Sequence, residues 1–288
     1  MTVLTNKIDF AVVISVNNAN PNGDPLNGNR PRQNYDGHGE ISDVAIKRKI
    51  RNRLQDMGEA IFVQSNDRSD DGLKSLRERA ETNENIKEIL KDKQKTEDDF
   101  AQAACKEWID VRSFGQVFAF KSSGSRGSGV SIGVRGPVSV HTATSIDPID
   151  ITSMQITKSV NTEPGEKRGS DTMGTKHRVD FGVYVFYGSI NTQLAEKTGF
   201  SRDDAEKIKQ ALITLFENDA SSARPEGSME IRKVYWWEHD SKLGQYSSAK
   251  VHRLLKVEAA TDEPSTFEDY SITLDELEGL AVEELDGQ

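Results

Sequence analysis

The stretch IDFAVVISVN at residues 8–17 decides how the rest of the chain is interpreted. Its residues are apolar and β-branched almost without interruption, which is typical of a strand buried on both faces. The segment ISDVAIKRKIRNRL follows at residues 41–54, where Ser42 offers an N-cap and apolar residues recur at helical spacing. We therefore predict a central strand and then, after a long loop, an amphipathic helix over residues 42–57.

Further along, strands and helices continue to alternate. Strand patterns occur at residues 111–120, 138–142, 151–157, 179–190, 230–238 and 251–257. A second helix begins at the capping-box pair Ser201 and Asp204. The order strand, helix, strand, strand, helix, strand is that of the split βαβ unit of ferredoxin-like and RRM folds. The expected fold class is α/β, in the α+β sense, with an antiparallel sheet.

Long connections interrupt this order. Residues 18–40 are dense in Asn, Gly, Pro and Arg, and we predict neither helix nor strand there. Residues 59–110 carry mixed charges and few large apolar groups, which indicates a solvated helical insertion. Within it, Phe100, Ala104 and Trp108 recur every four residues and should form one buried face.

The charge of the chain is distributed unevenly. The 288 residues carry a formal net charge of −10, but eleven acidic residues and no Lys or Arg lie between residue 258 and the end. Without that tail, residues 1–257 carry +1. Basic patches are therefore compatible with the composition, and a nucleic-acid partner stays open despite the acidic total. In the tail, leucines among acidic residues at 273–285 suggest a short amphipathic helix or docking segment.

Several classes of protein are disfavoured. No apolar run approaches the roughly 18 residues that span a bilayer, so we expect no membrane protein. Residues 1–7 lack the features of a secretory signal and Cys105 is the single cysteine, which together indicate the cytoplasm. Phosphate-loop, HExxH, CxxC and GxSxG motifs are absent, and the histidines show no pair at ligand spacing. We accordingly expect no catalytic site, no metal and no cofactor.

The helix at 42–57 carries an unusual cluster of cations, namely Lys47, Arg48, Lys49, Arg51 and Arg53. They lie off the predicted apolar stripe, and like charges four residues apart repel one another. A bound polyanion would relieve this repulsion, which favours phosphate binding over an ordinary solvated face.

A second basic segment lies at residues 158–178. It combines cations with a lone apolar Met173 flanked by small residues; the cations are Lys158, Lys167, Arg168, Lys176 and Arg178. One interpretation is a hairpin that reaches over a nucleic-acid strand and wedges an apolar side chain between bases. A plain surface loop explains the composition equally well.

A series of motifs resembles the CRISPR-associated backbone subunit of the type I-C Cascade complex, within the RAMP superfamily. They occur in family order between about residues 8 and 257. The motifs are NPNGDP (20–25), GNRPR (28–32), ISDVAIKRKIRNRL (41–54), RSFG (112–115), VRGPV (134–138), TMGTKH (172–177) and LAEKTGF (194–200).

The resemblance implies a single RRM-like domain over residues 1–257, followed by the acidic tail 258–288. Within that domain it implies a palm (8–57 and 111–257), the insertion 59–110 as fingers, and a β-hairpin thumb at about 146–180.

The resemblance also implies a function without catalysis. Copies of the chain would line up head to tail along the spacer of a CRISPR RNA and present it for pairing with target DNA in antiviral defence. Further implied partners are the endoribonuclease that processes the CRISPR RNA, the large and small subunits of the complex, and a helicase–nuclease that it recruits. No membrane partner is implied.

Candidate RNA-binding residues follow from the motif positions. They are Asn22, Arg32, Ser42, Lys47, Arg48, Lys49, Arg51, Arg135, Lys176 and His177, with Met173 as the thumb wedge.

Two alternatives remain open. Related backbone subunits of type III complexes cleave bound RNA with a loop aspartate and a metal ion, and Asp24 and Asp36 lie in the loop after the first strand. Asp24 in NGDP is, however, also well suited to a turn. The other alternative is a stand-alone RRM-like regulator that binds as a monomer and without a guide.

Overall fold

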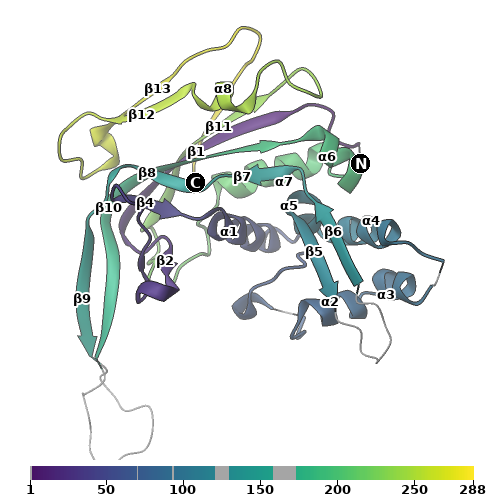
Figure 1. Cartoon of the computed structure of the whole chain (residues 1–288). Coiled ribbons are helices and arrows are strands. Elements are labelled where there is room, and N and C mark those ends of the chain that lie inside the picture. The colour runs from purple at the N-terminus through teal and green to yellow at the C-terminus, as the bar shows by residue number, and fades with distance from the viewer. Residues whose placement is uncertain (1, 70, 93, 121–129, 158–172) are drawn as a thin grey trace, which may run out of the picture.

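A large antiparallel sheet forms the centre of the computed structural model, which describes residues 2–69, 71–92, 94–120, 130–157 and 173–288 (Figure 1). Its strands run in the order β14-β11-β1-β10-β8-β4, and β7 and β9 also pair with β10. The strands are β1 (Ile8–Ala19), β4 (His38–Ile41), β7 (Val138–Val140), β8 (Ala143–Pro148), β9 (Ile151–Thr157), β10 (Met173–Ile190), β11 (Met229–Glu238) and β14 (Glu283–Asp286).

Strand β1 lies between β10 and β11, as its apolar sequence predicts. Val12 stands opposite Phe186 of β10 and Val234 of β11. Phe10 and Val12 face one hydrophobic core, whereas Ala11 faces the other. The prediction of a central strand is confirmed, because a strand covered on both faces requires apolar residues at successive positions.

The sheet has the connectivity predicted from the order of elements. We number the strands in chain order, with β1 as first, β7 and β8 together as second, β10 as third and β11 as fourth. Their order across the sheet is then fourth, first, third, second, and neighbouring strands are antiparallel. A helical segment lies between the first and second strands, and another between the third and fourth. This is the split βαβ arrangement, so the expected fold class is confirmed.

Helices cover one face of the sheet (Figure 1). The main ones are α1 (Asp43–Asp56) and α7 (Arg202–Ile213), accompanied by the short α5 (Ile109–Phe114) and α6 (Thr192–Thr198). Ile50 of α1 and Ile208 of α7 are fully buried in the core beneath β1, each contributing about 2 kcal/mol to stability. Both predicted N-caps are confirmed, because the side chains of Ser42 and Ser201 accept hydrogen bonds from the first helical turn.

The C-terminal segment covers the opposite face. It comprises α8 (Ser248–His252), β12 (Leu255–Ala259), the 3-10 turn η3 (Phe267–Asp269), β13 (Tyr270–Leu274) and β14. Val251 and Leu255 pack with Val13 of β1 in the second core. The strand predicted at 251–257 is wrong at residues 251 and 252, which belong to α8, and confirmed at residues 255–257, which belong to β12. Of the amphipathic helix or docking segment predicted at 273–285, the helix is wrong, because residues 273–274 belong to β13 and residues 283–285 to β14. Pairing of β14 with the edge of β11 outweighs the helical spacing of its leucines.

The predicted helical insertion is present and has its own core. It contains the 3-10 turn η2 (Asn66–Arg68), α2 (Leu76–Thr82), α3 (Glu84–Lys91) and α4 (Glu97–Glu107). Phe100 and Trp108 are buried together with Phe62, which confirms the predicted apolar face. The same core includes Phe118 of a hairpin formed by β5 (Gly115–Phe120) and β6 (Val130–Arg135), a two-stranded sheet separate from the main one.

The strand predicted at 111–120 is wrong in its first four residues, which belong to helix α5. Helix α5 ends and strand β5 begins at Gly115, whose φ of +78° disfavours other residues. A side chain on Gly115 would meet the Val134 carbonyl oxygen at 2.3 Å, and one on Gly136 would meet the Ser113 carbonyl oxygen at 2.3 Å. The glycines of the RSFG and VRGPV motifs thus serve the close approach of two backbones.

The loop predicted at 18–40 is partly regular. It contains a small hairpin of β2 (Gly23–Asp24) and β3 (Arg30–Pro31), joined through the 3-10 turn η1 (Pro25–Asn27), and it ends in β4. Among the described residues, no helix is long and apolar enough to cross a membrane.

A buried ionic cluster joins β1 to the C-terminal segment. The Asp9 carboxylate is fully buried, and Lys7 Nζ and His239 Nε2 each lie 2.9 Å from its Oδ2. His252 Nε2 of α8 lies 3.8 Å from Oδ1. Burial lowers the pKa of His252. Burial raises the pKa of Asp9, but hydrogen bonds from His239, Ser248 and Lys7 outweigh it and lower the pKa overall.

We predict that acid destabilises the protein through this cluster. His252 and Asp9 both hold protons less readily in the folded chain, so unfolding takes up protons and stability falls as pH falls. The decline should begin below about pH 6.5, where an unfolded histidine becomes protonated. Melting curves between neutral and mildly acidic pH should show a shallower decline for His252→Gln and an unchanged one for His177→Gln, on the hairpin. An unaltered slope in His252→Gln would contradict this explanation.

Candidate nucleic-acid interface

The start of helix α1 brings three predicted residues together. Asn22 Oδ1 accepts a hydrogen bond from the backbone N–H of Ser42 at 2.9 Å, and the side chain of Ser42 caps the helix. The backbone N–H of Arg32 donates to the Asn22 carbonyl at 3.0 Å. The guanidinium of Arg32 lies 3.5 Å from Asp24 and is partly exposed. Asn22, Arg32 and Ser42 therefore form one cluster, although twenty residues separate its ends.

The same loop contacts the hairpin of β9 and β10. Arg30 Nη1 donates to Ser153 Oγ at 3.0 Å, and Ser153 Oγ lies 2.7 Å from His177 Nδ1. Lys176 and His177 are half-buried on β10, close to the base of the hairpin. Arg30 was not predicted as a site residue, although it lies within the quoted GNRPR motif.

Met173 lies farther out on the hairpin, opposite Thr157, and is 62 % exposed. The register places Met173 on the same face as Gln155, whereas the exposed Met154 and Ile156 of β9 point to the other face of the hairpin. Residues 158–172 of the predicted thumb, including Lys158, Lys167 and Arg168, lie outside the described residues.

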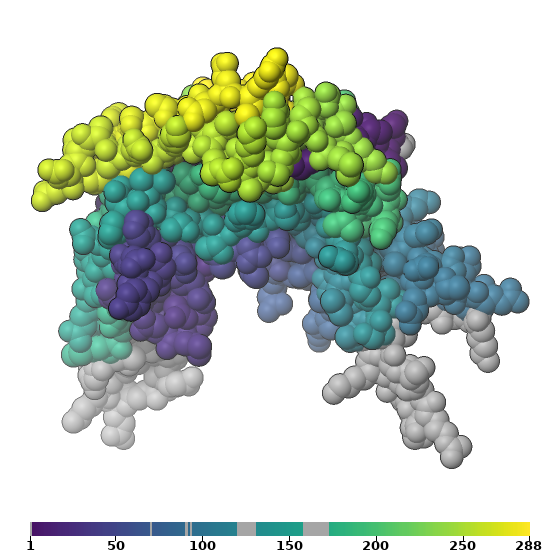
Figure 2. Space-filling model, turned by 45° about the horizontal axis from the view of Figure 1, so that its top comes forward, coloured from purple at the N-terminus to yellow at the C-terminus, as the bar shows by residue number. Residues whose placement is uncertain are grey.

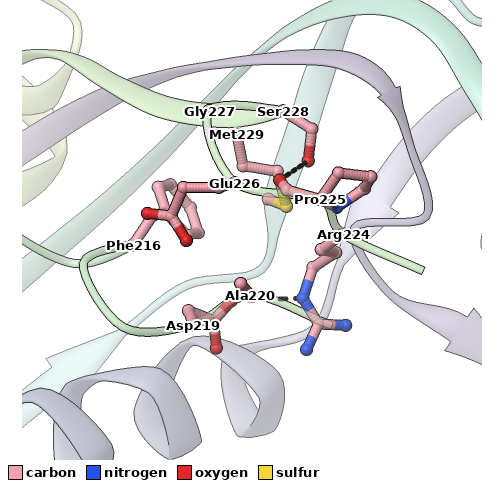
Figure 3. Close-up of a pocket in the computed structure, with 9 residues that line it drawn as sticks. All are labelled: Phe216, Asp219, Ala220, Arg224, Pro225, Glu226, Gly227, Ser228 and Met229. Atoms are coloured by element: carbon pink, nitrogen blue, oxygen red, sulfur yellow. Dashed lines mark hydrogen bonds and ion pairs between the residues drawn. The ribbon is translucent and has the colours of Figure 1, made fainter. Parts of the chain in front are cut away.

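The cations of helix α1 have partners within the chain. Lys49 is 6 % exposed and forms an ion pair with Asp219, which also holds Arg224 at 3.1 Å (Figure 3). Burial lowers the pKa of Lys49 to about 8. The prediction that all five cations lie off the buried face is therefore wrong for Lys49.

Arg51 and Arg48 face the helical insertion. Arg51 Nε donates to Asp110 Oδ2 at 3.0 Å, and Arg48 donates to the carbonyl of Val63. Asp110 is fully buried and also accepts the backbone N–H groups of Phe62 and Val63 at 2.8 and 3.1 Å. This carboxylate holds both ends of the insertion against α1.

Lys47 and Arg53 complete the set. Lys47 Nζ lies 3.0 Å from Asp43 on the surface of the helix, and Arg53 pairs with Glu217 and donates to Thr214 Oγ1 at 2.7 Å. Carboxylates from other parts of the chain thus offset the charge of Lys49, Arg51 and Arg53, so their mutual repulsion needs no bound polyanion to relieve it.

The molecule is hollowed between two projections (Figure 2). The β2–β3 loop and the β9–β10 hairpin form one side, and the β5–β6 hairpin with the helical insertion forms the other. Helix α1 lies between them (Figures 1 and 2). Arg135 is exposed and is the last residue of β6, which belongs to the side of the hollow opposite the β9–β10 hairpin.

The two aspartates of the RNase alternative differ, because the Asp24 carboxylate has local partners whereas only the backbone of Asp36 does. Asp24 Oδ1 accepts from the backbone N–H of Leu26 at 3.2 Å and faces Arg32. Asp36 lies in a turn, where its N–H donates to Asn34 Oδ1 at 3.0 Å. Within the described part of the chain, no three His, Cys, Asp or Glu side chains are placed to hold a metal ion.

Residues 6–275 match the sequence profile of a family described as CRISPR-associated protein Cas7. The chain belongs to the Cas7 family. A relative described as CRISPR-associated protein Cas7, from Haloferax volcanii, is 28 % identical over 274 residues, which cover 89 % of this chain and 76 % of the relative.

Two solved structures resemble this Cas7 family member. One is a chain of a "CRISPR RNA-guided surveillance complex", with a TM-score of 0.46 and 16 % identity over 80 % of this chain and 68 % of that one. The other, of a "CRISPR RNA-guided surveillance complex, pre-nicking", has a TM-score of 0.47 and 15 % identity over 80 % and 78 %.

In this Cas7 chain, we predict that the Lys49–Asp219 pair holds the middle of α1 against the loop after α7. Asp219→Ala would leave a buried ammonium without its partner and should lower the free energy of unfolding by about 3 kcal/mol. The double change Lys49→Met with Asp219→Ala should recover most of that loss. Urea denaturation measures the free energy of unfolding of both variants.

The matched control is Asp203→Ala, which removes a half-exposed partner of Lys207 and should cost less than about 1 kcal/mol. Equal losses for Asp203→Ala and Asp219→Ala would contradict a special role for the buried pair.

Proposed function

We propose that this Cas7 family member is a backbone subunit of a CRISPR RNA-guided surveillance complex, of type I-C, and holds guide RNA in the hollow beside α1. The observation that carries the proposal is the convergence of the GNRPR loop, the capped start of α1 and the β9–β10 hairpin on one side of that hollow. Family membership and the type I-C motifs support the same function.

The hollow presents groups that suit a sugar-phosphate chain. Arg32, Lys176 and His177 lie along one side, Lys47 on the helix and Arg135 on the other side. Cations and capped helix starts bind phosphates without reading bases. Sequence recognition is then left to base pairing between the guide and target DNA.

The main sheet itself offers no open platform for bases. In RRM domains, aromatic residues on one face of the sheet stack on RNA bases. Here helices cover one face and the C-terminal segment covers the other, with Trp236 and Trp237 buried on opposite faces. We therefore propose that the RNA binds at the loop after β1, the start of α1 and the β9–β10 hairpin.

The parts of the molecule acquire roles under this proposal. The main sheet is the palm, residues 59–110 are the fingers, and the hairpin within residues 146–180 is the thumb, all in one domain of residues 1–257 before the acidic tail. Lys49 and Arg51 act indirectly by fixing α1, whereas Asn22, Ser42 and Arg48 lie at the edge of the bound backbone. Copies would join head to tail along the RNA in the cytoplasm with the other subunits, and the chain would break no bond itself.

Removing two of the proposed phosphate contacts should weaken guide binding equally for different spacer sequences. The variant Lys47→Ala with Lys176→Ala should lower the slope of log affinity against log salt by about 1.4, because each phosphate contact on a single strand contributes about 0.7. Filter binding at several salt concentrations measures the slope. Lys74→Ala with Lys87→Ala removes two exposed lysines of the insertion as a control. A loss that depends on the spacer sequence would contradict backbone recognition.

Replacing the exposed apolar group of the hairpin should change base stacking but not stability. Met173→Ser should leave the melting temperature unaltered, because the side chain is 62 % exposed. A guide carrying 2-aminopurine should fluoresce less when bound to this variant, because its bases stack again without the wedge. Leu243→Ser, at another exposed apolar position, should leave the fluorescence unaltered. Equal fluorescence in the wild type and Met173→Ser would contradict the role of Met173 as a wedge between bases.

Cleavage of bound RNA by the assembled protein, lost in Asp24→Ala, would overturn the non-catalytic part of the proposal.

A further inference from the structure

The acidic tail ends in a strand that covers one edge of the main sheet. Strand β14 pairs with residues 233–236 of β11 and is the outermost strand on that side. The other neighbour of β11 is β1, so β14 is the strand that closes the outer edge of β11. Gly287 extends this cover, because a side chain there would collide with the backbone of Ile231. The N–H of Gln288 then donates to the Ile213 carbonyl of α7 at 3.1 Å.

Charge contributes more than apolar burial to the attachment of β14. Its carboxylates form three ion pairs with lysines of the neighbouring elements, with N–O distances of 2.7–2.8 Å. The pairs are Lys209 of α7 with Glu283, and Lys233 of β11 with Glu284 and with Asp286. Of the four side chains of β14, only Leu285 packs against a core. Ion pairs of exposed carboxylates are individually weak and are screened by salt, so this attachment can be released.

The edge beneath β14 is that of a strong strand former. Residues 234–237 have the sequence VYWW, and each is 2 % exposed or less because both faces of the sheet are covered. A regular apolar strand with an open edge pairs readily with a strand of another chain. Strand β14 presents three carboxylates at the new edge, and like charges there repel a second copy. The tail thus replaces an edge that is prone to pairing with a negatively charged one.

We propose that β14 is a detachable cover, which keeps β11 of the free chain from pairing with β11 of a second copy. The β11 edge already accepts an antiparallel strand. A twofold axis normal to the sheet would supply β11 of the second copy in that direction and would leave the helices of both copies on the same face. The cover concerns the free chain and so goes beyond the proposed function. One consequence rests on that function: chains would then associate along guide RNA and not through their sheet edges.

The experiment uses the full-length protein without RNA, so its outcome does not depend on guide binding. The cover variant combines Glu283→Gln, Glu284→Gln and Asp286→Asn, which removes the ion pairs and retains the length of the strand. The matched control combines Asp262→Asn, Glu276→Gln and Glu278→Gln. It removes the same charge from exposed positions of the tail that form no ion pair with any described residue. Hydrogen exchange followed by mass spectrometry measures the opening of each segment.

Residues 283–288 should exchange about tenfold faster in the cover variant than in the wild type, which corresponds to about 1.4 kcal/mol for the three ion pairs together. Salt at about 1 M, where the Debye length is about 3 Å, should accelerate this exchange in the wild type but not in the cover variant. The control variant should behave as the wild type does. Exchange in the central strand β1 should stay slow in all three proteins, which shows that the fold is retained.

Protein concentration tests what the released edge binds. In dilute solution, residues 233–236 of the cover variant should lose protection along with the tail. At higher concentration they should regain it, while sedimentation velocity shows dimers. The wild type and the control variant should remain monomers over the same concentration range.

Four results would overturn the proposal. The first is equal exchange of residues 283–288 in the cover and control variants, since the ion pairs would then not hold the strand. The second is a cover variant that stays monomeric while its β11 edge is unprotected. The third is equal dimerisation of both variants, which would indicate only overall charge. The fourth is a dimer in which residues 283–288 gain protection, because β14 itself would then form the contact.

Discussion

Burial of β1 on both faces and along both edges is the constraint on which the structure depends. Phe10 and Val12 require a helical layer on one side, and Ala11 and Val13 require the C-terminal segment on the other. A sheet covered in this way cannot offer its faces to a ligand, which is why the proposed guide interface lies at the rim of the sheet. There the loop after β1, the start of α1 and the β9–β10 hairpin meet around one hollow.

The cations of α1 fix the helix within the molecule and, under the proposed function, also suit a guide interface. Asp110 and Asp219 come from different parts of the chain and each binds a cation of the helix. Through these pairs the helix holds the insertion on one side and the loop after α7 on the other. The cations that remain partly exposed, such as Lys47, are carried by a helix whose position is fixed. Under the proposed function, the internal ion pairs would also serve the guide interface, because a backbone-binding surface needs rigid placement of its charges.

Local contacts explain individual motifs of the sequence. Gly115 of RSFG and Gly136 of VRGPV approach each other where any side chain would collide with backbone atoms. Arg30 of GNRPR reaches the hairpin through Ser153. LAEKTGF instead forms most of helix α6 and lines a cleft away from that interface. The motifs therefore divide among backbone geometry, the proposed guide interface and a separate part of the fold.

The sequence alone determined β1, α1, the capping box at Ser201, the helical character of the insertion and, through its motifs, the family. These features are local, because periodicity, caps and short motifs act within a few residues. Tertiary structure decided that 111–114 are helical, that the tail pairs with β11 rather than forming a helix, and that Lys49 is buried. Lys49 and Asp219 lie 170 residues apart, so only the folded path of the chain brings them together. The sequence alone shows that the cations of α1 are clustered. The carboxylates that bind them come from distant segments, whose positions follow from packing around the central sheet.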